Sequence, residues 1–309
     1  MEVDERTPLT GRPDFPTGID NTMRVSFSGC PRKFEIEHLH HIRPNFPSIH
    51  LIAGGAMAKG LEIFRLGVYK DGLPEEQAFF RAVVGIIREW GDNDIFEEHN
   101  KSLWNVILAV EHYISEWSPA TDTLRPAKLN GEWGIECSFA LPIPDVFHPQ
   151  TGEPLLYTGR YDMLAQVGDA LYVEDDKTTG SLGPSWVKQW SLNSQFTGYC
   201  WAAKQHGIPV AGAIIRGIAF LKSRFDTAQC LVYRSDWEIE RWLLQLQRDA
   251  RRMIAAWEDG YFDYALGTAC GNFGGCSFMR LCEQKHPEKW VFPDYKIEKW
   301  DPLANVKGE

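Results

Sequence analysis

Two acidic residues and a lysine in the middle of the chain have the types and spacing of a hydrolytic site. Asp175 and Lys177 are two residues apart in YVEDDKTT, so on a β-strand their side chains emerge from the same face, and the neighbouring acidic side chains point the other way. Asp162 lies in GRYDML on the preceding strand, and the hairpin turn predicted at VGDA, residues 167–170, brings it beside Asp175. The sequence therefore predicts that two carboxylates and an ammonium group meet at one place.

This carboxylate–lysine group (Asp162, Asp175 and Lys177) suits the hydrolysis of a phosphodiester. Carboxylate oxygens are the ligands that Mg²⁺ and Mn²⁺ prefer. A cation held there polarises the scissile phosphate and helps to generate hydroxide from bound water. The ammonium group orients that water or stabilises the developing negative charge. The same three residues are also typical of a solvated strand end, so alone they leave both interpretations open.

The elements that position this group are predicted from the spacing of apolar residues. The N-terminal half has the apolar period and the capping residues of helices, and after the proline-bearing stretch SPATDTLRPAKLNGE the pattern becomes that of short strands. The order of helices, strands, helix, strands and helix predicts an α/β core with a helical N-terminal elaboration. The helices are expected over residues 26–41, 49–69, 74–90, 96–117, 185–205 and 236–259, and the strands over IECSFALPI, LYTGRYDMLAQV, ALYVEDDKTT, AGAIIRGIAFLK and TAQCLVYR.

Four consecutive segments are expected along the 309 residues. They are a flexible N-terminal tail (1–22), a helical region (23–125), the core that contains the strands (126–262), and a cysteine-rich segment that wraps over this core and ends in a C-terminal tail (263–309).

Composition and charge restrict the class of protein. The chain is 44% hydrophobic and 24% charged, and its length allows a large apolar core. No apolar run is long enough to span a bilayer, and the acidic N-terminus is not typical of a signal peptide, so a cytoplasmic location is expected. The net charge of −10 argues against indiscriminate binding to nucleic acid, although a local basic groove is compatible with it.

A glutamine and a tyrosine follow the carboxylate–lysine group on a predicted helix. Gln195 and Tyr199 are spaced i, i+4 and therefore share one face, as ordinary surface residues also do. The motifs GxxD, DxK followed by TT, and QxxxY stand in that order along the chain. Together they resemble the RecB-like branch of the PD-(D/E)xK nuclease superfamily, and the resemblance extends from about Ser26 to Cys282.

This resemblance implies a fold and a set of roles. The fold is a restriction-endonuclease-like core, with a central mixed sheet flanked by helices. Asp162 and Asp175 are expected to bind catalytic Mg²⁺ or Mn²⁺, and Lys177 is expected to assist. Gln195 and Tyr199 are expected to face the active-site groove and the DNA.

One position departs from the pattern of these nucleases. Many relatives carry a metal-binding histidine on an early helix, and in GGAMAKGLEIFR the corresponding residue is Ala58. Glu62 lies one turn later on the same face and is expected either to supply a carboxylate to the metal or to be a surface glutamate. Glu136, on the first strand, is a further candidate, but an ordinary polar strand residue is the interpretation that we favour there.

The seven cysteines divide into two groups. Cys270, Cys276 and Cys282 lie in the glycine-rich CGNFGGCSFMRLC, and Cys30 lies far upstream in SFSGCPRKF. One cysteine before the core and three after it resembles the iron–sulfur nucleases of the RecB-like group, including the AddB nuclease domain, the CRISPR adaptation exonucleases and phage RecB-like exonucleases. A structural [4Fe–4S] cluster held by these four thiolates is therefore expected, and structural Zn²⁺ is the alternative. The remaining cysteines lie singly in apolar elements and are expected to be packing residues: Cys137, Cys200 and Cys230.

Basic residues near the motifs are candidates for contact with DNA phosphates. They are Arg32, Lys33, Arg160 and Lys188. Trp186 and Trp190 are interpreted as core residues rather than stacking platforms for bases.

The combined prediction is a Mg²⁺- or Mn²⁺-dependent DNA exonuclease. Its substrates are expected to be DNA ends or single strands, in recombination, repair or CRISPR adaptation. The sequence has no P-loop motif, so any helicase activity is expected to come from a recombination or helicase partner. The alternative is a DNA-end-binding or scaffold protein with a degenerate nuclease fold, for which Ala58 is the motivation.

Overall fold

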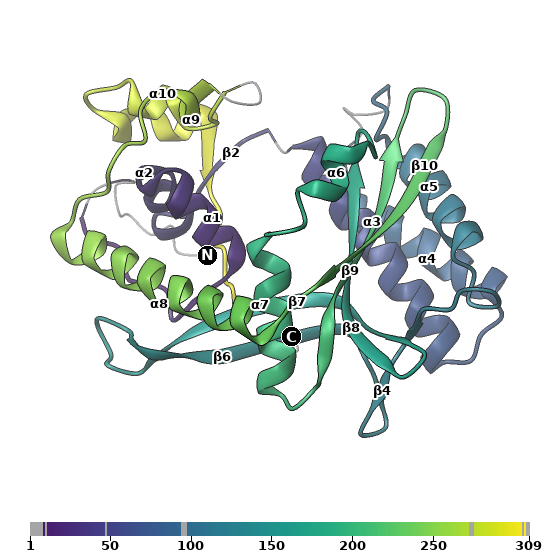
Figure 1. The fold of residues 1–309 in the computed structure, drawn as a ribbon. Helices are drawn as coiled ribbons and strands as arrows, with labels where there is room; N and C mark the ends of the chain where they lie inside the picture. Colours follow the sequence, from purple (N-terminus) through teal and green to yellow (C-terminus); the bar gives the residue numbers. More distant parts are fainter. Residues whose placement is uncertain are drawn as a thin grey trace. The chain divides into compact units, whose positions relative to one another are not determined.

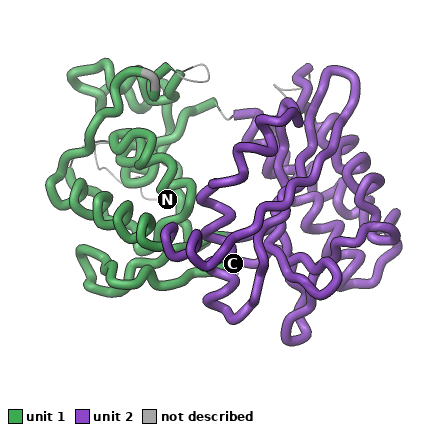
Figure 2. Tube along the Cα trace, viewed as in Figure 1, with its two compact units in different colours: residues 1–46, 139–159, 243–309 green, residues 47–138, 160–242 purple. Residues whose placement is uncertain are grey.

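The computed structural model describes residues 9, 11–46, 48–93, 98–271, 275–304 and 306, which belong to two compact units (Figure 2). Unit 1 contains Met1–Phe46, Phe139–Gly159 and Leu243–Glu309, and unit 2 contains Pro47–Ser138 and Arg160–Trp242. Each unit is assembled from separated segments of the chain. The division into four consecutive segments stays a prediction.

A mixed β-sheet forms the centre of the fold, as predicted (Figure 1). Strands β7 (Pro154–Val167) and β8 (Ala170–Thr179) are antiparallel, and Val167 pairs with Ala170 across the predicted turn. Strand β9 (Val210–Phe220) is parallel to β8, and β10 (Phe225–Tyr233) is antiparallel to β9. The sheet therefore combines parallel and antiparallel pairs.

Shorter strands extend this sheet along β7. In unit 1, β1 (Gly18–Ile19) pairs in parallel with β7. In unit 2, β3 (Arg125–Pro126) pairs with the end of β7, and β6 (Ile135–Phe147), which like β7 belongs to both units, is another neighbour. A separate small hairpin consists of β4 (Lys128–Leu129) and β5 (Glu132–Trp133).

Helices cover both faces of the sheet in unit 2 (Figure 1). The helices on one face share an apolar core in which small residues allow α3 and α4 to approach closely; Gly60 and Gly85 each face an isoleucine of the other helix. These helices are α3 (Ile49–Arg65), its π-helical extension η2 (Leu66–Lys70), α4 (Glu75–Trp90) and α5 (Leu103–Glu116). The other face carries α6 (Pro184–Lys188) and α7 (Ser194–Gln205).

Capping residues explain where the structure differs from the predicted helix boundaries. Ser102 accepts a hydrogen bond from the Asn105 N–H and so begins α5 later than predicted; residues 96 and 97 lie outside the described residues. Asn193 accepts from the Gln195 N–H, which separates α7 from α6 within a segment predicted as one helix.

Unit 1 is mainly helical. Its helix α8 (Asp236–Asp259), with the predicted bounds, begins in unit 2 and continues into unit 1, where its Asp249 Oδ2 binds the Arg24 Nη2 of α1 at 2.7 Å. The other elements are α1 (Asn21–Gly29), α2 (Pro31–Phe34), the π-helix η1 (Glu35–Leu39), β2 (Ile42–Pro44), α9 (Thr268–Gly271), α10 (Met279–Cys282), the 3₁₀ helix η5 (Pro287–Trp290), α11 (Val291–Asp294) and β11 (Tyr295–Ile297), which pairs antiparallel with β2.

A break at Cys30 interrupts the helix predicted over residues 26–41. Cys30 is extended, with φ −163° and ψ 107°, and separates α1 from α2. The cause is Pro31, because a proline ring disfavours the helical conformation of the residue before it. The break leaves Cys30 in the bend between two helices and not on a helical face.

Part of the segment predicted as a flexible tail is packed in unit 1. The side chain of Phe15 is buried, and its carbonyl oxygen lies 2.8 Å from the His148 Nε2. The indole N–H of Trp257 donates to the Pro13 carbonyl at 2.7 Å. Residues 1–8 and 10 lie outside the described residues. Within the described ranges, no helix combines the length and the apolar character that crossing a membrane requires.

Candidate active site

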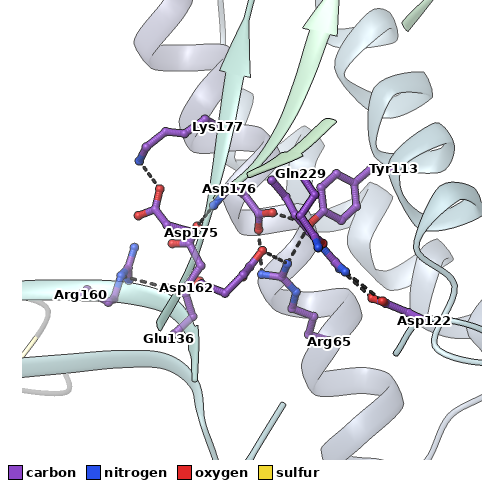
Figure 3. Close-up of polar contacts among 12 residues, drawn as sticks. Arg65, Tyr113, Asp122, Glu136, Arg160, Asp162, Asp175, Asp176, Lys177 and Gln229 are labelled. Atoms are coloured by element: carbon purple, nitrogen blue, oxygen red, sulfur yellow. Dashed lines mark hydrogen bonds and ion pairs between the residues drawn. The ribbon is translucent and has the colours of Figure 1, made fainter. Parts of the chain in front are cut away.

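The β7–β8 hairpin brings the carboxylate–lysine group together, as predicted (Figure 3). Met163 pairs with Glu174 in the hairpin, so Asp162 reaches the level of Asp175. The Oδ2 atom of Asp162 accepts a hydrogen bond of 2.7 Å from the backbone N–H of Asp176. The Lys177 ammonium forms an ion pair with Oδ1 of Asp175. Asp162, Asp175 and Lys177 therefore lie within one small region of unit 2.

The alternate residues of β8 form a separate buried network on the face of the sheet that α3 and α5 cover. Arg65 of α3 lies 2.8 Å from Asp176 Oδ2 and 3.3 Å from Glu174 Oε1. Tyr113 of α5 accepts from the Arg65 guanidinium at 3.1 Å and donates to Asp176 Oδ1. This network fixes the strand that carries the carboxylate–lysine group.

A second arginine extends this network along the sheet. Arg216 of β9 binds both carboxylate oxygens of Asp122, at 2.7 and 2.9 Å, and donates to the Gln229 side chain at 2.9 Å. Its guanidinium also lies 4.5 Å from the ring centroid of Trp117. A small cavity of about 30 Å³ is lined by both arginines together with Tyr113 of α5 and Trp117, which follows that helix. Because a carboxylate binds each of these arginines, Arg65 and Arg216, we interpret the network as structural and not catalytic. It stabilises β8 and β9.

Glu136 joins the carboxylate cluster, in contrast to the ordinary strand role that we favoured from the sequence. It has a positive φ of 54° within β6, a conformation that is uncommon for a residue with a side chain. Just before it, Gly134 accepts a hydrogen bond from the Leu164 N–H at 2.7 Å, and a Cβ at Gly134 would meet the Leu164 side chain at 2.7 Å. This close approach holds Glu136 beside β7, where Arg160 Nε, in the middle of that strand, lies 2.8 Å from the Glu136 carboxylate (Figure 3).

The buried carboxylates disfavour one another's ionisation. Burial raises the pKa of Asp162 well above its usual range, and the charges of Asp175 and Asp176 raise it further, against the opposing effect of Lys177. Burial also raises the pKa of Asp175, although Lys177 opposes the shift. For Glu136, burial raises the pKa to about 7 in spite of Arg160. A divalent cation would offset this concentrated negative charge, so the donor set fits Mg²⁺ or Mn²⁺.

The helix position that departs from the nuclease pattern lies close to this cluster. Ala58 is half-buried on α3. One turn later, Glu62 is close enough to raise the pKa of Glu136 by charge repulsion, after the larger effects of burial and of Arg160. The Glu62 carboxylate also binds Lys59 Nζ at 2.7 Å. Glu62 and Glu136 are therefore both near the position that a histidine would occupy.

Gln195 and Tyr199 form a pair on α7. The Gln195 side-chain N–H donates to the Tyr199 hydroxyl at 2.7 Å. Between them, Phe196 places its ring centroid 5.8 Å from Lys177 Nζ. The ring of Tyr199 lies 5.8 Å from that of Tyr161, the residue before Asp162. The predicted pair therefore flanks the carboxylate–lysine group on the face covered by α7.

The predicted phosphate-binding residues lie in different surroundings. Arg160 is held by Glu136, and Lys188 is exposed at the end of α6. In unit 1, Arg32 pairs with Glu35, and Lys33 Nζ lies 3.9 Å from a carboxylate oxygen of Glu37. Two tryptophans interpreted as core residues are buried: Trp186 and Trp190.

The four predicted cluster cysteines all belong to unit 1, and three of them lie near enough to Cys282 to affect its pKa. Burial raises the pKa of Cys282 to about 11, and the nearby Cys276, Cys30 and Cys270 raise it further, against Arg32. Gly275, with a φ of +103°, precedes Cys276, whose N–H donates to the Cys270 carbonyl at 2.8 Å. Residues 272–274 lie outside the described residues. Four neighbouring thiols fit a [4Fe–4S] cluster or Zn²⁺ as a donor set.

The remaining cysteines lie apart from this group. Cys200 and Cys230 are buried, and Cys137 is half-buried. Across the described ranges of both units, no three His, Cys, Asp or Glu side chains are arranged so that they could already hold a metal ion. In the carboxylate cluster, carboxylate oxygens are already bound by other groups: Lys177 binds Asp175, Arg160 binds Glu136, and the backbone N–H of Asp176 binds Asp162.

Two supporting residues, Arg65 and Tyr113, were not identified from the sequence, and a third, Glu136, was named only as the weakest candidate. Arg65 and Tyr113 occupy ordinary helical positions, and helix spacing does not show which strand they face. The sequence could not show where the Glu136 side chain points, because its left-handed backbone depends on the close approach between Gly134 and β7. Arg65 follows Glu62 by three residues, which was the available signal that both lie on one helix face.

Comparison with known proteins identifies a family over most of the chain. Residues 25–283 match the family described as the PD-(D/E)XK nuclease superfamily. A solved structure from Eubacterium rectale, named as a candidate exonuclease, has 13% identity and a TM-score of 0.49, with 82% of this chain and 87% of that chain covered. The structure of SSO0001 has 12% identity and a TM-score of 0.26, with 63% and 75% covered. No curated protein matches the sequence. The family match includes all of the carboxylate–lysine group.

Proposed function

This chain belongs to the PD-(D/E)XK nuclease superfamily, and on that basis we propose that it is a metal-dependent DNA exonuclease that hydrolyses phosphodiester bonds. The observation that carries the proposal is the meeting of Asp162, Asp175 and Lys177 at the β7–β8 hairpin. Action from DNA ends is supported by the RecB-like motifs GxxD, DxK and QxxxY.

Asp162 and Asp175 are the proposed ligands of Mg²⁺ or Mn²⁺. Burial is the first cause of their raised pKa values, and a bound cation would offset it by favouring the ionised carboxylates. Glu136 and Glu62 are the candidates for a further carboxylate ligand near Ala58. When bound, the cation would polarise the scissile phosphate and supply hydroxide from water at neutral pH.

Lys177 has a proposed role as a cation and not as a base. Burial alone would lower its pKa, but Asp175 and Asp162 outweigh burial and raise it. The side chain is therefore protonated at neutral pH and is suited to orienting water or stabilising negative charge on the phosphate. Gln195 and Tyr199, joined by their hydrogen bond on α7, are proposed to position the DNA strand beside it.

We also propose that Cys30, Cys270, Cys276 and Cys282 hold a structural [4Fe–4S] cluster. The effect of Cys276, Cys30 and Cys270 on the pKa of Cys282, together with the apolar surroundings of Cys276 and Cys282, supports this proposal. Zn²⁺ remains the competing occupant, because four thiolates suit it equally. Anaerobically purified protein should contain iron and inorganic sulfide and absorb broadly in the visible range. A colourless protein that contains zinc would remove the cluster from the proposal.

The setting of the activity is proposed from the motifs. DNA ends or single strands are the expected substrates, with Arg32, Lys33, Arg160 and Lys188 as candidate phosphate contacts. Recombination, repair and CRISPR adaptation are the settings that the RecB-like resemblance suggests, with a helicase or recombination protein as a partner. A cytoplasmic location agrees with such a role.

A nuclease assay tests the main proposal. Purified protein is incubated with Mn²⁺ and with end-labelled single-stranded and double-stranded DNA, each also supplied blocked at one end. Wild type is expected to degrade DNA from an open end, and Asp175→Asn, which keeps the side-chain shape, is expected to be inactive. Equal rates for the two proteins would reject the nuclease. Tight binding of DNA ends by both, without cleavage, would instead support the alternative of a DNA-end-binding scaffold, which Ala58 motivates.

A further inference from the structure

Glu136 and Arg160 form an ion pair beside the carboxylate–lysine group, and both residues belong to unit 2. The Nε atom of Arg160 lies 2.8 Å from Oε2 of Glu136. The Oε2 atom is buried, and no group in the described part of the chain donates a hydrogen bond to it. The Arg160 side chain is 37% exposed and that of Glu136 only 12%. The arginine can therefore leave this contact for the solvent side, whereas the carboxylate stays buried.

The Glu136 carboxylate lies beside the proposed metal ligand Asp162 (Figure 3). Its charge raises the pKa of Asp162, after the larger effects of burial, Asp175 and Asp176. The left-handed backbone of Glu136, with a φ of 54°, is unfavourable for a residue with a side chain, and conformations of this kind concentrate at functional sites. Glu136 therefore brings a further carboxylate to the place where a divalent cation would be bound.

The position of Arg160 on β7 suits contact with a phosphate. Arg160 and Asp162 are two residues apart, so their side chains emerge from the same face of the sheet. A DNA phosphate that reaches a cation held by Asp162 therefore also comes within reach of the Arg160 guanidinium. The planar guanidinium binds two oxygens of a phosphate at once, through hydrogen bonds that are stronger than those between neutral groups. A phosphate is thus a better partner for Arg160 than Glu136, whose Oε2 accepts no hydrogen bond from any described residue.

A divalent cation competes with Arg160 for the same carboxylate. A guanidinium and a metal ion on one buried carboxylate repel each other at short range, where the surroundings screen charge poorly. A phosphate between them removes this repulsion, because it binds both. Glu136 is therefore released most readily when DNA is present.

We propose that Arg160 exchanges Glu136 for a phosphate when DNA binds, and that the released Glu136 becomes a third carboxylate ligand of the cation, with Asp162 and Asp175. This inference rests on the proposed nuclease and adds the regulation of its site: DNA completes the metal site, and the protein alone binds metal more weakly. Because coupling between two ligands is reciprocal, the cation also strengthens the binding of DNA. Without DNA, Arg160 is a positioning residue that holds Glu136 away from the metal.

The binding of Mn²⁺ to the protein without DNA tests the first half of the exchange. Mn²⁺ is titrated and its unbound fraction is measured by electron paramagnetic resonance. Wild type, Arg160→Met, Glu136→Gln and the double variant form a double-mutant cycle. Arg81→Met is the matched control, because Arg81 of α4 forms an exposed ion pair of 3.0 Å with Asp71 in the same unit. Thermal unfolding in EDTA verifies that each variant is folded.

Arg160→Met should bind Mn²⁺ about tenfold more tightly than wild type, a coupling of ordinary size, and Arg81→Met should bind it as wild type does. In the Glu136→Gln protein, Arg160→Met should change the Mn²⁺ affinity by about twofold or less, because the carboxylate that it would release is absent. An equal gain with and without Glu136 would mean that Arg160 acts only through its general charge, and it overturns the exchange. Should Arg160→Met fail to fold, Arg160→Gln, which is also neutral, takes its place in the same cycle.

A phosphorothioate oligonucleotide, whose linkages resist hydrolysis, tests the second half. It should raise the Mn²⁺ affinity of wild type by about tenfold and that of Arg160→Met by clearly less, because Glu136 is already released in the variant. In EDTA, Arg160→Met should also bind this oligonucleotide with a salt dependence smaller by about one phosphate contact. An oligonucleotide that raises the Mn²⁺ affinity equally in both proteins overturns the exchange.

Failure of the exchange is distinguishable from failure of the nuclease. DNA cleavage by wild type, together with an unchanged Mn²⁺ affinity of Arg160→Met, removes only the exchange. A gain in Mn²⁺ affinity that depends on Glu136, in a protein that does not cleave DNA, supports the exchange and removes only the nuclease.

Discussion

Replacing Glu136 by glutamine should change the pH dependence of stability in a definite direction. Burial is the main reason that the pKa of this carboxyl is raised from 4.5 to about 7, and Glu62 adds to the shift while Arg160 opposes it. Because its pKa is raised in the folded state, Glu136 makes its full contribution to the free energy of unfolding below pH 4.5. This contribution is lost as the pH rises through 7. Glutamine has the shape of the protonated side chain and does not titrate, so Glu136→Gln removes this loss.

The expected size follows from the same shift. Each pKa unit corresponds to about 1.4 kcal/mol, so the shift of Glu136 corresponds to roughly 3 kcal/mol at pH 8, where the carboxylate is ionised in both states. At pH 5 the contribution is below about 1 kcal/mol, because the folded state is protonated there. The side chain is 12% exposed, so solvent screening reduces these values little. The free energy of unfolding of Glu136→Gln relative to wild type should therefore rise by about 2 to 3 kcal/mol from pH 5 to pH 8.

Urea unfolding at pH 5 and pH 8, with EDTA present to remove divalent cations, measures this difference. Glu132→Gln is a suitable control, since Glu132 is an exposed residue of β5 and its replacement should have the same small effect at both pH values. If Glu136→Gln changes the free energy of unfolding equally at pH 5 and pH 8, Glu136 does not belong to a buried cluster of like charges.

Three further changes test other parts of the fold and site. Arg65→Met leaves Asp176 buried without its ion pair and should lower the free energy of unfolding by about 3 to 5 kcal/mol in urea titrations; a loss below about 1 kcal/mol would contradict the buried network. Tyr199→Phe removes the acceptor of a 2.7 Å hydrogen bond and should lower the free energy of unfolding by about 1 kcal/mol. The same variant should cleave DNA roughly tenfold more slowly or worse, and a rate equal to that of wild type would exclude a positioning role. Cys282→Ser should lose iron and visible absorbance, whereas Cys230→Ser, in β10, should retain both.

Features set by neighbouring residues were predictable from the sequence. The hairpin of β7 and β8 follows from a turn signal between two runs of strand residues, and its register brings Asp162 to Asp175. The long helix α8 has a strong apolar period and the predicted bounds. Pro31 is a local signal too, and its effect on Cys30 explains why the predicted N-terminal helix is interrupted.

Features set by packing were not predictable in this way. Arg65 and Tyr113 support β8 because α3 and α5 happen to cover that face of the sheet, and no local spacing specifies this arrangement. Glu136 depends on the approach of β6 to β7 at Gly134 and Leu164. Contacts of this kind join segments that lie far apart along the chain. The spacing of apolar residues within each segment does not show which segments will meet.

The assembly of unit 1 has a consequence for how the protein is made. Its segments are the first 46 residues, a short middle piece and the last 67 residues, and β2 finds its partner β11 only in the final stretch. During synthesis, all of unit 2 has left the ribosome before unit 1 can close. Until then β2 lacks its partner strand β11, and its exposed edge is open to association with other chains. The late closure of unit 1 keeps the nascent chain open to such association until residues 243–309 have been made, and chaperones that act during this interval would have the greatest effect on yield.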